Sequence, residues 1–271
     1  MPSSESSAPR AAIKLNTDTA HPARVYDYWL RGKDNYEADR RVGDAMIAAI
    51  PETRQSCLDN RGFLTRAVRH LAQSHGIRQF LDIGSGLPTS PNVHEVAQGV
   101  APESRIVYVD NDPIVQVHGR SLLTSSPEGT TTYLGADLRE VEKILEEAAE
   151  TLDLSRPVLV VLAAILHFVP EEADPRGLVR RFMEPLPAGS ALALSHMTAD
   201  GTPSDYSEHV KHTWAAGGVN MNLRGKEQIA EYFTGLELLD PGIVPVHQWR
   251  PDQQVDRPRW WLWSGVALKT S

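Results

Sequence analysis

Several features that mark particular classes of protein are scarce or missing in this sequence. The 271 residues include one cysteine, Cys57, which excludes an intramolecular disulfide and a zinc site built on cysteine thiolates. The longest strongly apolar run, residues 158–169, is too short for a transmembrane helix, which needs about 20 apolar residues. We therefore expect no membrane-spanning segment, and we interpret this run as a central strand of a sheet.

Positive charge is also scarce. Lys and Arg number 27 against 35 Asp and Glu, which gives a formal net charge of −8 at pH 7. A phosphate backbone or an anionic membrane surface attracts proteins of the opposite sign, so we expect no nucleic-acid and no membrane partner. Residues 1–20 are rich in Ser, Ala and Pro and lack the apolar core of a secretory signal peptide. We predict a disordered tail there, on a cytoplasmic protein.

Beyond this tail, apolar periodicity divides the chain into two parts. Residues 21–76 have helical spacing with an interruption at Pro51, and we predict a helical N-terminal cap there. In residues 77–271, short apolar runs alternate with amphipathic stretches. We expect strands at about 79–83, 105–109, 131–134, 157–165 and 189–195, with a helix after each of the first four. Such alternation predicts a parallel sheet with helices on both faces.

The last part of the chain breaks this alternation. Residues 236–239, 243–249 and 259–269 are strand-like and are separated by loops, which is typical of an antiparallel hairpin that closes a sheet. A mostly parallel, Rossmann-like α/β sheet of seven strands with such a hairpin is the outline of a class I methyltransferase. A dehydrogenase would additionally need a second, substrate-binding domain.

A glycine pair follows the first predicted strand directly. Gly84 and Gly86 enclose Ser85, and a strand that ends in such a turn lets the backbone approach a ligand closely. The dinucleotide fingerprint has a third glycine, but Thr89 occupies that position here, and Pro88 removes a backbone donor that a pyrophosphate would use. S-adenosylmethionine carries no phosphate and tolerates both changes, so the turn favours it as the cofactor.

Carboxylates at the ends of the first three predicted strands strengthen this interpretation. Asp110, which Asn111 follows, can accept hydrogen bonds from both ribose hydroxyls. Asp137 can accept the adenine amine while Leu138 packs on the ring, and Asp82 with the backbone of the glycine turn can meet the ammonium of the methionine moiety. The alternative is that these aspartates only cap the helices that follow them.

Residues 23–36 combine aromatic, charged and amide side chains within a short stretch of the predicted cap. We expect this segment to fold over the cofactor, with Tyr28, Lys33 and Asn35 facing the pocket. The alternative is a surface helix that buries only its aromatic side chains.

Two histidines follow the fourth and fifth predicted strands, where side chains that face a substrate usually lie. His167 and His196 are the candidate catalytic residues, because the ordinary pKa of histidine, near 6.5, suits a general base. Methyl transfer needs a base only when the acceptor loses a proton, so either histidine can instead have a binding or packing role. His209 and His212 have helical spacing without a third ligand, and we predict no metal site.

Longer motifs resemble a known family. Residues 80–98, FLDIGSGLPTSPNVHEVAQ, resemble the signature of an actinobacterial family of S-adenosylmethionine-dependent methyltransferases that was long catalogued as a domain of unknown function. Further blocks occur in the same order at residues 23–36, 107–113, 166–170, 195–196, 240–242 and 249–251, so the resemblance covers about residues 20–268. One departure is Arg31, where the family commonly has glycine. The resemblance implies this cofactor and the class I fold, and it implies little about the acceptor.

We therefore expect an S-adenosylmethionine-dependent methyltransferase that acts on a small-molecule acceptor, which the acidic charge balance favours over RNA or DNA. Two alternatives stay open. One is a regulatory protein that binds the cofactor without turnover, because methyl transfer needs no fixed set of catalytic residues. The other is an NAD(P)-dependent oxidoreductase, which the missing third glycine disfavours. Nothing in the sequence specifies an oligomeric state.

Overall fold

The computed structural model describes residues 16–122, 125–200, 204–257 and 260–271. Most of the predicted disordered tail, residues 1–15, lies outside the described residues. Residues 16–20 pack against the first helix, where the Arg24 guanidinium donates hydrogen bonds to the backbone carbonyls of Asn16 and Thr19. Among the described helices, none combines the length and apolarity needed to cross a membrane.

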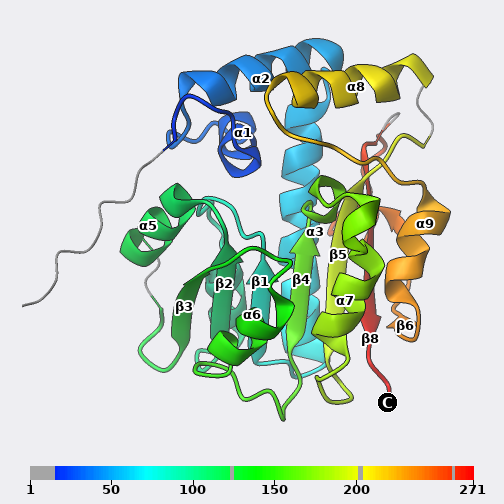
Figure 1. The fold of residues 1–271 in the computed structure, drawn as a ribbon. Helices are drawn as coiled ribbons and strands as arrows, with labels where there is room; N and C mark the ends of the chain where they lie inside the picture. The colour runs from blue at the N-terminus through cyan, green and yellow to red at the C-terminus, as the bar shows by residue number, and fades with distance from the viewer. Residues whose placement is uncertain (1–15, 123–124, 201–203, 258–259) are drawn as a thin grey trace, which may run out of the picture.

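One mixed sheet forms the centre of the molecule (Figure 1). The described strands follow the order β3-β2-β1-β4-β5-β8-β6, and β7 pairs with β8. β1 to β5 are parallel, whereas β8 runs antiparallel to β5. The strands are β1 (Gln79–Ile83), β2 (Arg105–Asp110), β3 (Thr130–Gly135), β4 (Leu159–Ala163), β5 (Ala191–Met197), β6 (Glu237–Leu238), β7 (Val244–Pro245) and β8 (Leu262–Leu268). The predicted Rossmann-like fold of class I methyltransferases is confirmed.

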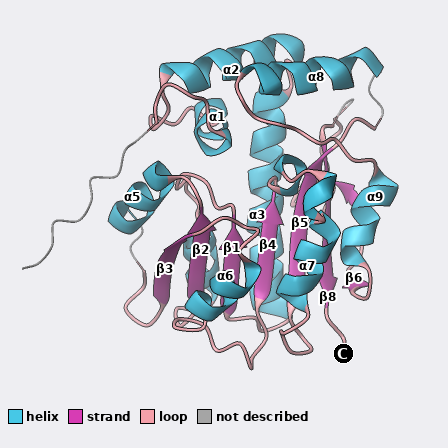
Figure 2. Ribbon diagram, in the orientation of Figure 1, coloured by secondary structure: helices cyan, strands magenta, loops and turns pink. Residues whose placement is uncertain are grey.

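Helices cover both faces of this sheet (Figures 1 and 2). One face carries α6 (Val141–Ala148), α7 (Pro175–Met183) and α9 (Lys226–Ala230), and the core on the other face includes α3 (Thr53–Ser74), α4 (Val93–Val100) and α5 (Pro113–Leu122). Because both faces are covered, β1 is buried along its whole length. Phe80 packs in the core with α3, and Leu81 and Ile83 pack in the core with α6 and α7.

The C-terminal hairpin differs from its prediction in one respect. Residues 243–249 do not form one extended strand, because only Val244 and Pro245 pair with β8. A turn follows, closed by a 2.8 Å hydrogen bond from Gln248 N to Pro245 O, and proline itself has no N–H to donate to a ladder. The outer strand of the hairpin is thus divided into β6 and β7, and the described residues form eight strands in place of the predicted seven.

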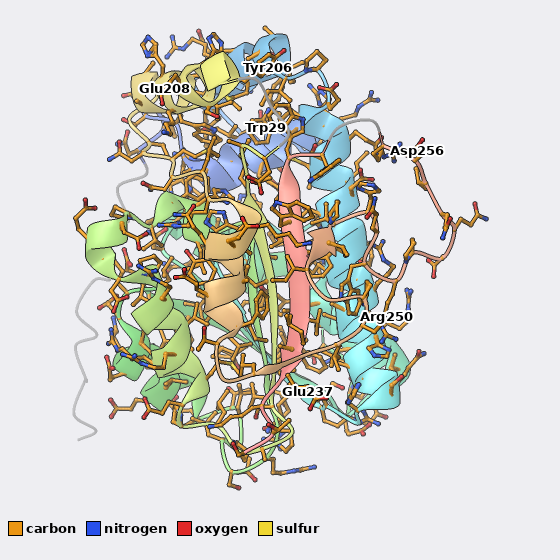
Figure 3. The ribbon with its side chains drawn as sticks, turned by 90° about the vertical axis from the view of Figure 1, so that its right-hand side faces the viewer. Trp29, Tyr206, Glu208, Glu237, Arg250 and Asp256 are labelled. Atoms are coloured by element: carbon orange, nitrogen blue, oxygen red, sulfur yellow. The ribbon has the colours of Figure 1, made fainter. Side chains whose placement is uncertain are left out.

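Three helices lie across the carboxyl ends of the parallel strands (Figure 1): α1 (Pro22–Trp29), α2 (Glu37–Ala49) and α8 (Ser204–Ala216). Figure 3 shows Trp29 below α2 and α8, at the end of the sheet opposite Glu237. The ring of Trp29 meets that of Trp214 edge to face, with the ring centroids 5.7 Å apart. This contact joins the N-terminal segment to α8 across the layer.

α3 connects the upper helices with the sheet. Its 22 residues span roughly 33 Å at the rise of an α-helix. Ala67, Val68 and Leu71 in its second half are buried against the sheet. Its first half therefore reaches beyond the sheet and lies beside the carboxyl ends of the strands.

A buried ion network fixes α1 between α2 and α5. Arg24 Nε lies 3.6 Å from Asp39 Oδ1 and 3.3 Å from Asp112 Oδ2, and the three side chains are between 0% and 5% exposed. Asp39 also accepts a hydrogen bond from Tyr36 N at the start of α2, and Asp112 accepts one from Ile114 N at the start of α5. Opposite charges that are buried together offset part of the desolvation that each would suffer alone.

Candidate active site

A cavity of about 370 Å³ opens at the carboxyl ends of the parallel strands. The strand order reverses between β1 and β4, and open α/β sheets bind ligands in the crevice at such a reversal. Nine predicted site residues line this cavity: Asp82, Gly84, Ser85, Gly86, Asp110, Asn111, Asp137, Leu138 and His167. The other four, Tyr28, Lys33, Asn35 and His196, are not part of its lining.

The lining has two parts with different chemistry. The acidic half consists of the lining residues at and directly after the carboxyl ends of β1, β2 and β3, together with His21 and Arg61 beside them. The aromatic half consists of all the other lining residues. They belong to α1, α2, α3 and α8 and the residues next to them, to the ends of β4 and β5 and the segments after these strands, and to residues 261–262 at the start of β8. All the carboxylates and guanidinium groups of the lining belong to the acidic half.

Gly84 and Gly86 shape the turn after β1. Both have positive φ angles, 70° and 66° respectively, which residues with a Cβ rarely adopt. A Cβ on Gly84 would lie 2.5 Å from Ile165 Cγ1 in the segment after β4. A Cβ on Gly86 would lie 4.0 Å from its nearest neighbour, the Cβ of Ala23. The turn is therefore packed tightly against the β4 side at Gly84 and has space at Gly86.

Asp110, at the end of β2, is oriented by backbone donors. Its Oδ2 accepts a hydrogen bond from Gly86 N and its Oδ1 accepts one from Asp112 N, both at 2.9 Å. Burial raises the pKa of this carboxyl above its ordinary value, and the two backbone hydrogen bonds oppose that shift. Ser85 in the same turn is tied to Tyr133 by a 2.5 Å hydrogen bond between their hydroxyls. A carboxylate has about four acceptor positions, so Asp110 retains capacity for ligand donors.

Asp82, at the end of β1, lacks such partners. The residue is 5% exposed, and its carboxyl accepts no hydrogen bond from a described residue. Burial raises its pKa to about 7, with the Arg61 guanidinium opposing the shift and the Asp110 carboxyl adding to it. A cationic ligand group in the cavity would supply the missing partner and favour the ionised carboxylate.

Asp137, after β3, is paired within its own loop. Its Oδ1 accepts hydrogen bonds from Arg139 Nε at 2.8 Å and from Arg139 N at 2.9 Å, and these interactions lower the pKa of the carboxyl. A hydrogen bond from Asn111 contributes to the same lowering. Leu138 adds an apolar surface to the lining. This corner of the acidic half therefore combines an ionised carboxylate with an apolar surface.

α3 contributes lining residues that the sequence analysis missed. Arg61 Nη2 donates to the carbonyls of Thr89 and Pro91, both at 2.6 Å, and so holds the loop after the glycine turn. Arg61 Nε is buried and has no acceptor among the described residues. A signal was present in the sequence, because positions 53, 56, 57, 60, 61 and 64 have helical spacing and line the cavity together. Polar Asn60 and Arg61 within such an otherwise buried stripe indicate a site.

His167, after β4, lies in the lining as a neutral ring. Burial lowers its pKa well below the ordinary value, and His196 and Arg224 add to this shift. His167 Nδ1 lies 3.3 Å from Met197 N and accepts its hydrogen bond, so the proton of the neutral ring is on Nε2. Nε2 makes no hydrogen bond to a described residue. The geometry therefore makes His167 a hydrogen-bond donor toward the cavity and does not favour the predicted role as a general base.

The prediction that His196 is catalytic is corrected by its contacts. His196 Nδ1 donates to Met197 O at 2.7 Å, and its Nε2 accepts from Arg224 Nη1 at 3.0 Å, so both nitrogens are occupied. Burial lowers the pKa of His196 to about 3. Arg224 also donates to the carbonyls of Leu166 and Val169, on either side of His167. His196 and Arg224 thus support the segment that carries His167.

The N-terminal segment reaches the cavity through a different face of α1 than we predicted. Tyr26 and Trp29, three residues apart on one face, line the cavity. Tyr28, on another face, donates its hydroxyl to a carboxylate of α2 at 2.6 Å. Asn35 donates to a carboxylate of α1 at 2.8 Å, and Lys33 is exposed. The expectation that Tyr28, Lys33 and Asn35 face the pocket is therefore corrected.

Metal-ligating side chains do not gather in the part of the chain that the structure describes, where no three His, Cys, Asp or Glu residues are placed to share an ion. His209 and His212 lie on α8 and line a groove between α8 and α2. Neither belongs to the lining of the active-site cavity.

The strand order, the antiparallel β8 and the carboxylates around a glycine turn define a Rossmann-like class I methyltransferase. Comparison with protein families agrees with this class. Residues 8–270 match the family described as S-adenosyl methyltransferase. The chain belongs to this family of S-adenosylmethionine-dependent methyltransferases.

Two solved structures are similar to this chain over nearly their whole length. A DUF574 family protein from Streptomyces avermitilis is 50% identical, with a TM-score of 0.91 over 94% of this chain and 100% of that one. A putative methyltransferase from Thermobifida fusca is 37% identical, with a TM-score of 0.87 over 95% of this chain and 97% of that one. These matches confirm the actinobacterial family that the motifs resemble. None of the curated protein sequences matches the chain.

Proposed function

We propose that this protein binds S-adenosylmethionine in the acidic half of the cavity and transfers its methyl group to a small molecule held in the aromatic half. The observation that carries the proposal is the convergence of Asp82, Asp110 and Asp137 around the glycine turn, at one edge of the sheet. When bound, S-adenosylmethionine supplies a methyl group on a positively charged sulfur, which keeps the bonding electron pair when the methyl group leaves.

Each group of the acidic half has a matching group on this cofactor. Asp110 accepts the ribose hydroxyls, and the corner formed by Asp137 and Leu138 receives the adenine. Asp82 offers a carboxyl group and Arg61 a guanidinium group, and each retains a polar atom without a hydrogen-bond partner among the described residues. The methionine moiety is a zwitterion, so its ammonium suits Asp82 and its carboxylate suits Arg61.

The start of α4 argues against a dinucleotide cofactor. α4 begins at Val93, well after the glycine turn, and its N-terminus is occupied by its own side chains. The Glu95 carboxylate accepts from Asn92 N at 2.5 Å, and Asn92 Oδ1 accepts from Thr89 N at 2.9 Å. A pyrophosphate needs free backbone donors at a helix start, and a carboxylate in that place repels it. A cofactor without phosphates avoids both conflicts.

The covering helices support a small acceptor. α1, α2 and α8 contribute Trp29, Met46 and Trp214 to the lining and close the aromatic half from above. Methyl transfer depends mainly on alignment and on exclusion of water. An apolar compartment covered by helices provides both for a small molecule, whereas a polymer would need an open groove.

Titration calorimetry of the full chain with S-adenosylmethionine, S-adenosylhomocysteine, NAD and NADP tests the proposed cofactor. We expect heat from the two sulfur nucleosides and none from the two dinucleotides. Binding of a nicotinamide cofactor without binding of either sulfur nucleoside would contradict the proposal.

Asp110→Asn tests the assignment within the acidic half. The change keeps the shape of the side chain but removes the charge that two ribose hydroxyls use, and it leaves either Gly86 N or Asp112 N without an acceptor. We therefore expect S-adenosylhomocysteine affinity to fall on the order of 100-fold, since a hydrogen bond to a charged group contributes about 1.5–3 kcal/mol. Asp153→Asn is the matched control, because this exposed aspartate accepts from Ser155 in the loop before β4, outside the cavity. Equal affinity in the two variants would refute the assignment.

A further inference from the structure

We propose that the methyl acceptor is an uncharged, flat aromatic molecule that presents an oxygen atom to His167. The inference rests on the proposed function and specifies its substrate class. It is carried by three properties of the aromatic half: a connected series of rings, the absence of formal charge among its lining side chains, and the small number of polar groups left for a ligand.

Four rings form a connected series along the aromatic half. Trp29 on α1 meets Trp214 on α8 with the ring centroids 5.7 Å apart, and Trp214 meets Phe168 at 5.4 Å. Phe168 in turn meets His167 at 4.3 Å. Rings arranged in this way present both faces and edges to a ligand. Aromatic rings pair by stacking or by edge-to-face contact, so this lining suits an aromatic ligand. Met46 and Met221 complete the lining with flexible side chains that adapt to a flat ligand.

The distribution of charge selects a neutral ligand. Asp82, Asp110 and Asp137 belong to the acidic half, as do the guanidinium groups of Arg61 and Arg139. The lining side chains of the aromatic half include no carboxylate, ammonium or guanidinium. A charged acceptor would therefore lose its hydration without gaining an ionic partner, and such a loss is costly. Amino acids, carboxylates and phosphorylated molecules do not fit this half.

Three of the four hydroxyl and amide side chains of the aromatic half are already hydrogen-bonded to the protein, and Ser56 is the exception among the described residues. Thr53 Oγ1 donates to Ile50 O at 2.7 Å, and Tyr26 donates to Cys57 O at 3.1 Å. The Asn60 amide is engaged at both ends: its Nδ2 donates to the Tyr26 hydroxyl at 3.1 Å, and its Oδ1 accepts from Ser195 Oγ at 2.6 Å. A ligand rich in hydroxyl or amide groups would find few partners here.

Four polar side-chain groups of the aromatic half make no hydrogen bond to a described residue and remain for the ligand. They are His167 Nε2, the Ser56 hydroxyl and the indole N–H groups of Trp214 and Trp261. Because Met197 N donates to His167 Nδ1, the opposite nitrogen carries the proton and donates into the cavity. An N–H donor pairs with an oxygen, such as that of a phenol. The neutral ring thus fixes the orientation of the acceptor without placing a charge beside it.

The test is titration calorimetry on the full chain saturated with S-adenosylhomocysteine, with 2-naphthol, 2-naphthoate and 2-naphthylmethylammonium as probes of one ring system. We expect 2-naphthol to bind at least about tenfold more tightly than either ion, because only the ions lose uncompensated hydration. Equal or tighter binding of an ion, or no binding of 2-naphthol, overturns the proposal. Binding of S-adenosylhomocysteine is measured first. If the protein did not bind it, the result would refute the proposed function rather than the proposed acceptor class.

Two tryptophan variants locate the probe. Trp214 and Trp249 are both fully buried, and the indole N–H of each lacks an acceptor among the described residues, but only Trp214 lines the cavity. We expect Trp214→Leu to weaken 2-naphthol binding at least about tenfold, through the loss of ring contact, and Trp249→Leu to leave it unchanged. Retained S-adenosylhomocysteine binding shows that each variant is folded. Equal weakening of 2-naphthol binding in the two folded variants would contradict the placement of the probe beside Trp214. The comparison of the three probes on the unmodified chain tests the proposal independently of both variants.

Discussion

In the acidic half of the cavity each carboxylate lies at or just after the carboxyl end of its own strand, whereas the aromatic half is assembled from distant parts of the sequence. Asp82, Asp110 and Asp137 come together because parallel strands end at the same edge of the sheet. Trp29 and Trp214 meet only because α1 and α8 pack together above that edge. A ligand site made from strand ends is determined by local sequence and sheet topology. A site made from covering helices is determined by tertiary packing and can change its lining independently of the sheet.

The two halves touch at Gly84, and a methyl group there has the largest expected effect. In Gly84→Ala the new Cβ would lie 2.5 Å from Ile165 Cγ1, at a φ of +70°. We expect this variant to lose on the order of 3 kcal/mol of unfolding free energy, through overpacking and through the cost of a left-handed backbone, and to bind S-adenosylmethionine poorly. Urea unfolding and calorimetry measure the two effects.

Gly86→Ala is the matched control for this variant. Gly86 has nearly the same φ, +66°, but its nearest neighbour would be 4.0 Å from the added methyl group. The control therefore carries only the backbone cost, about 1–2 kcal/mol. If the unfolding free energy fell by the same amount in both variants, the close contact between Gly84 and Ile165 would make no measurable contribution to the cost of the added methyl group.

Removing Arg224 should disturb the aromatic half and spare the acidic half. In Arg224→Met the buried Val169 carbonyl and His196 Nε2 lose their donor, whereas the Leu166 carbonyl keeps its hydrogen bond from Val169 N. We expect a loss of about 2–3 kcal/mol in unfolding free energy, since unpaired buried acceptors are costly. We also expect weaker 2-naphthol binding with unchanged S-adenosylhomocysteine affinity, because Arg224 positions the segment of His167 only.

A second arginine on the same carboxylate provides the comparison. Glu171 pairs with buried Arg224 and also with exposed Arg176. Exposed ion pairs contribute little to stability, so Arg176→Met should leave both ligand affinities unchanged. A change in S-adenosylhomocysteine affinity in Arg224→Met, but not in Arg176→Met, would show that the two halves are coupled through this arginine.

The sequence was sufficient to predict the aspartates and the glycine turn of the acidic half, but not His21 or Arg61, and the physical reason is topological. A glycine turn after a buried strand and aspartates after the next two strands must lie at one edge of a parallel sheet, so Gly84, Asp110 and Asp137 needed no tertiary information. Their roles toward the cofactor stay predictions. His167 was placed in the cavity by the same reasoning, but its protonation was not, because the donor to its Nδ1 comes from Met197 on the next strand.

The aromatic half could be predicted only in part. Asn60 carried a readable signal, as a polar residue within a helical stripe of α3 that lines the cavity. The face of α1 that reaches the cavity was not readable, because both faces carry aromatic residues, and the wrong one, with Tyr28, was selected. Trp214 and Arg224 lie in segments whose position depends on packing against α2 and β5, so no local pattern indicates their roles.

Buried Asp82 and the two buried histidines respond to pH in opposite directions. Burial raises the pKa of Asp82 to about 7, above its unfolded value of 3.8, so the folded state holds its proton more tightly and stability falls as pH rises between these values. Burial lowers the pKa of His196 to about 3 and also lowers that of His167, below the unfolded value of 6.5. For these histidines the unfolded state binds the proton more tightly, so stability falls as pH drops below 6.5.

Asp82→Asn separates these opposing contributions. The variant keeps the histidines, so its stability should rise with pH between 5 and 6.5, while the opposing carboxyl of the unmodified chain flattens that rise. We expect the difference in unfolding free energy, Asp82→Asn minus the unmodified chain, to grow with pH by about 1 kcal/mol per unit between pH 5 and 7, and less steeply near pH 7, where folded Asp82 begins to ionise. Urea unfolding of both proteins at pH 5, 6 and 7 measures this difference. Parallel stability curves would show that Asp82 is ionised in the folded protein throughout this range, and hence that the acidic half holds its charge without a ligand.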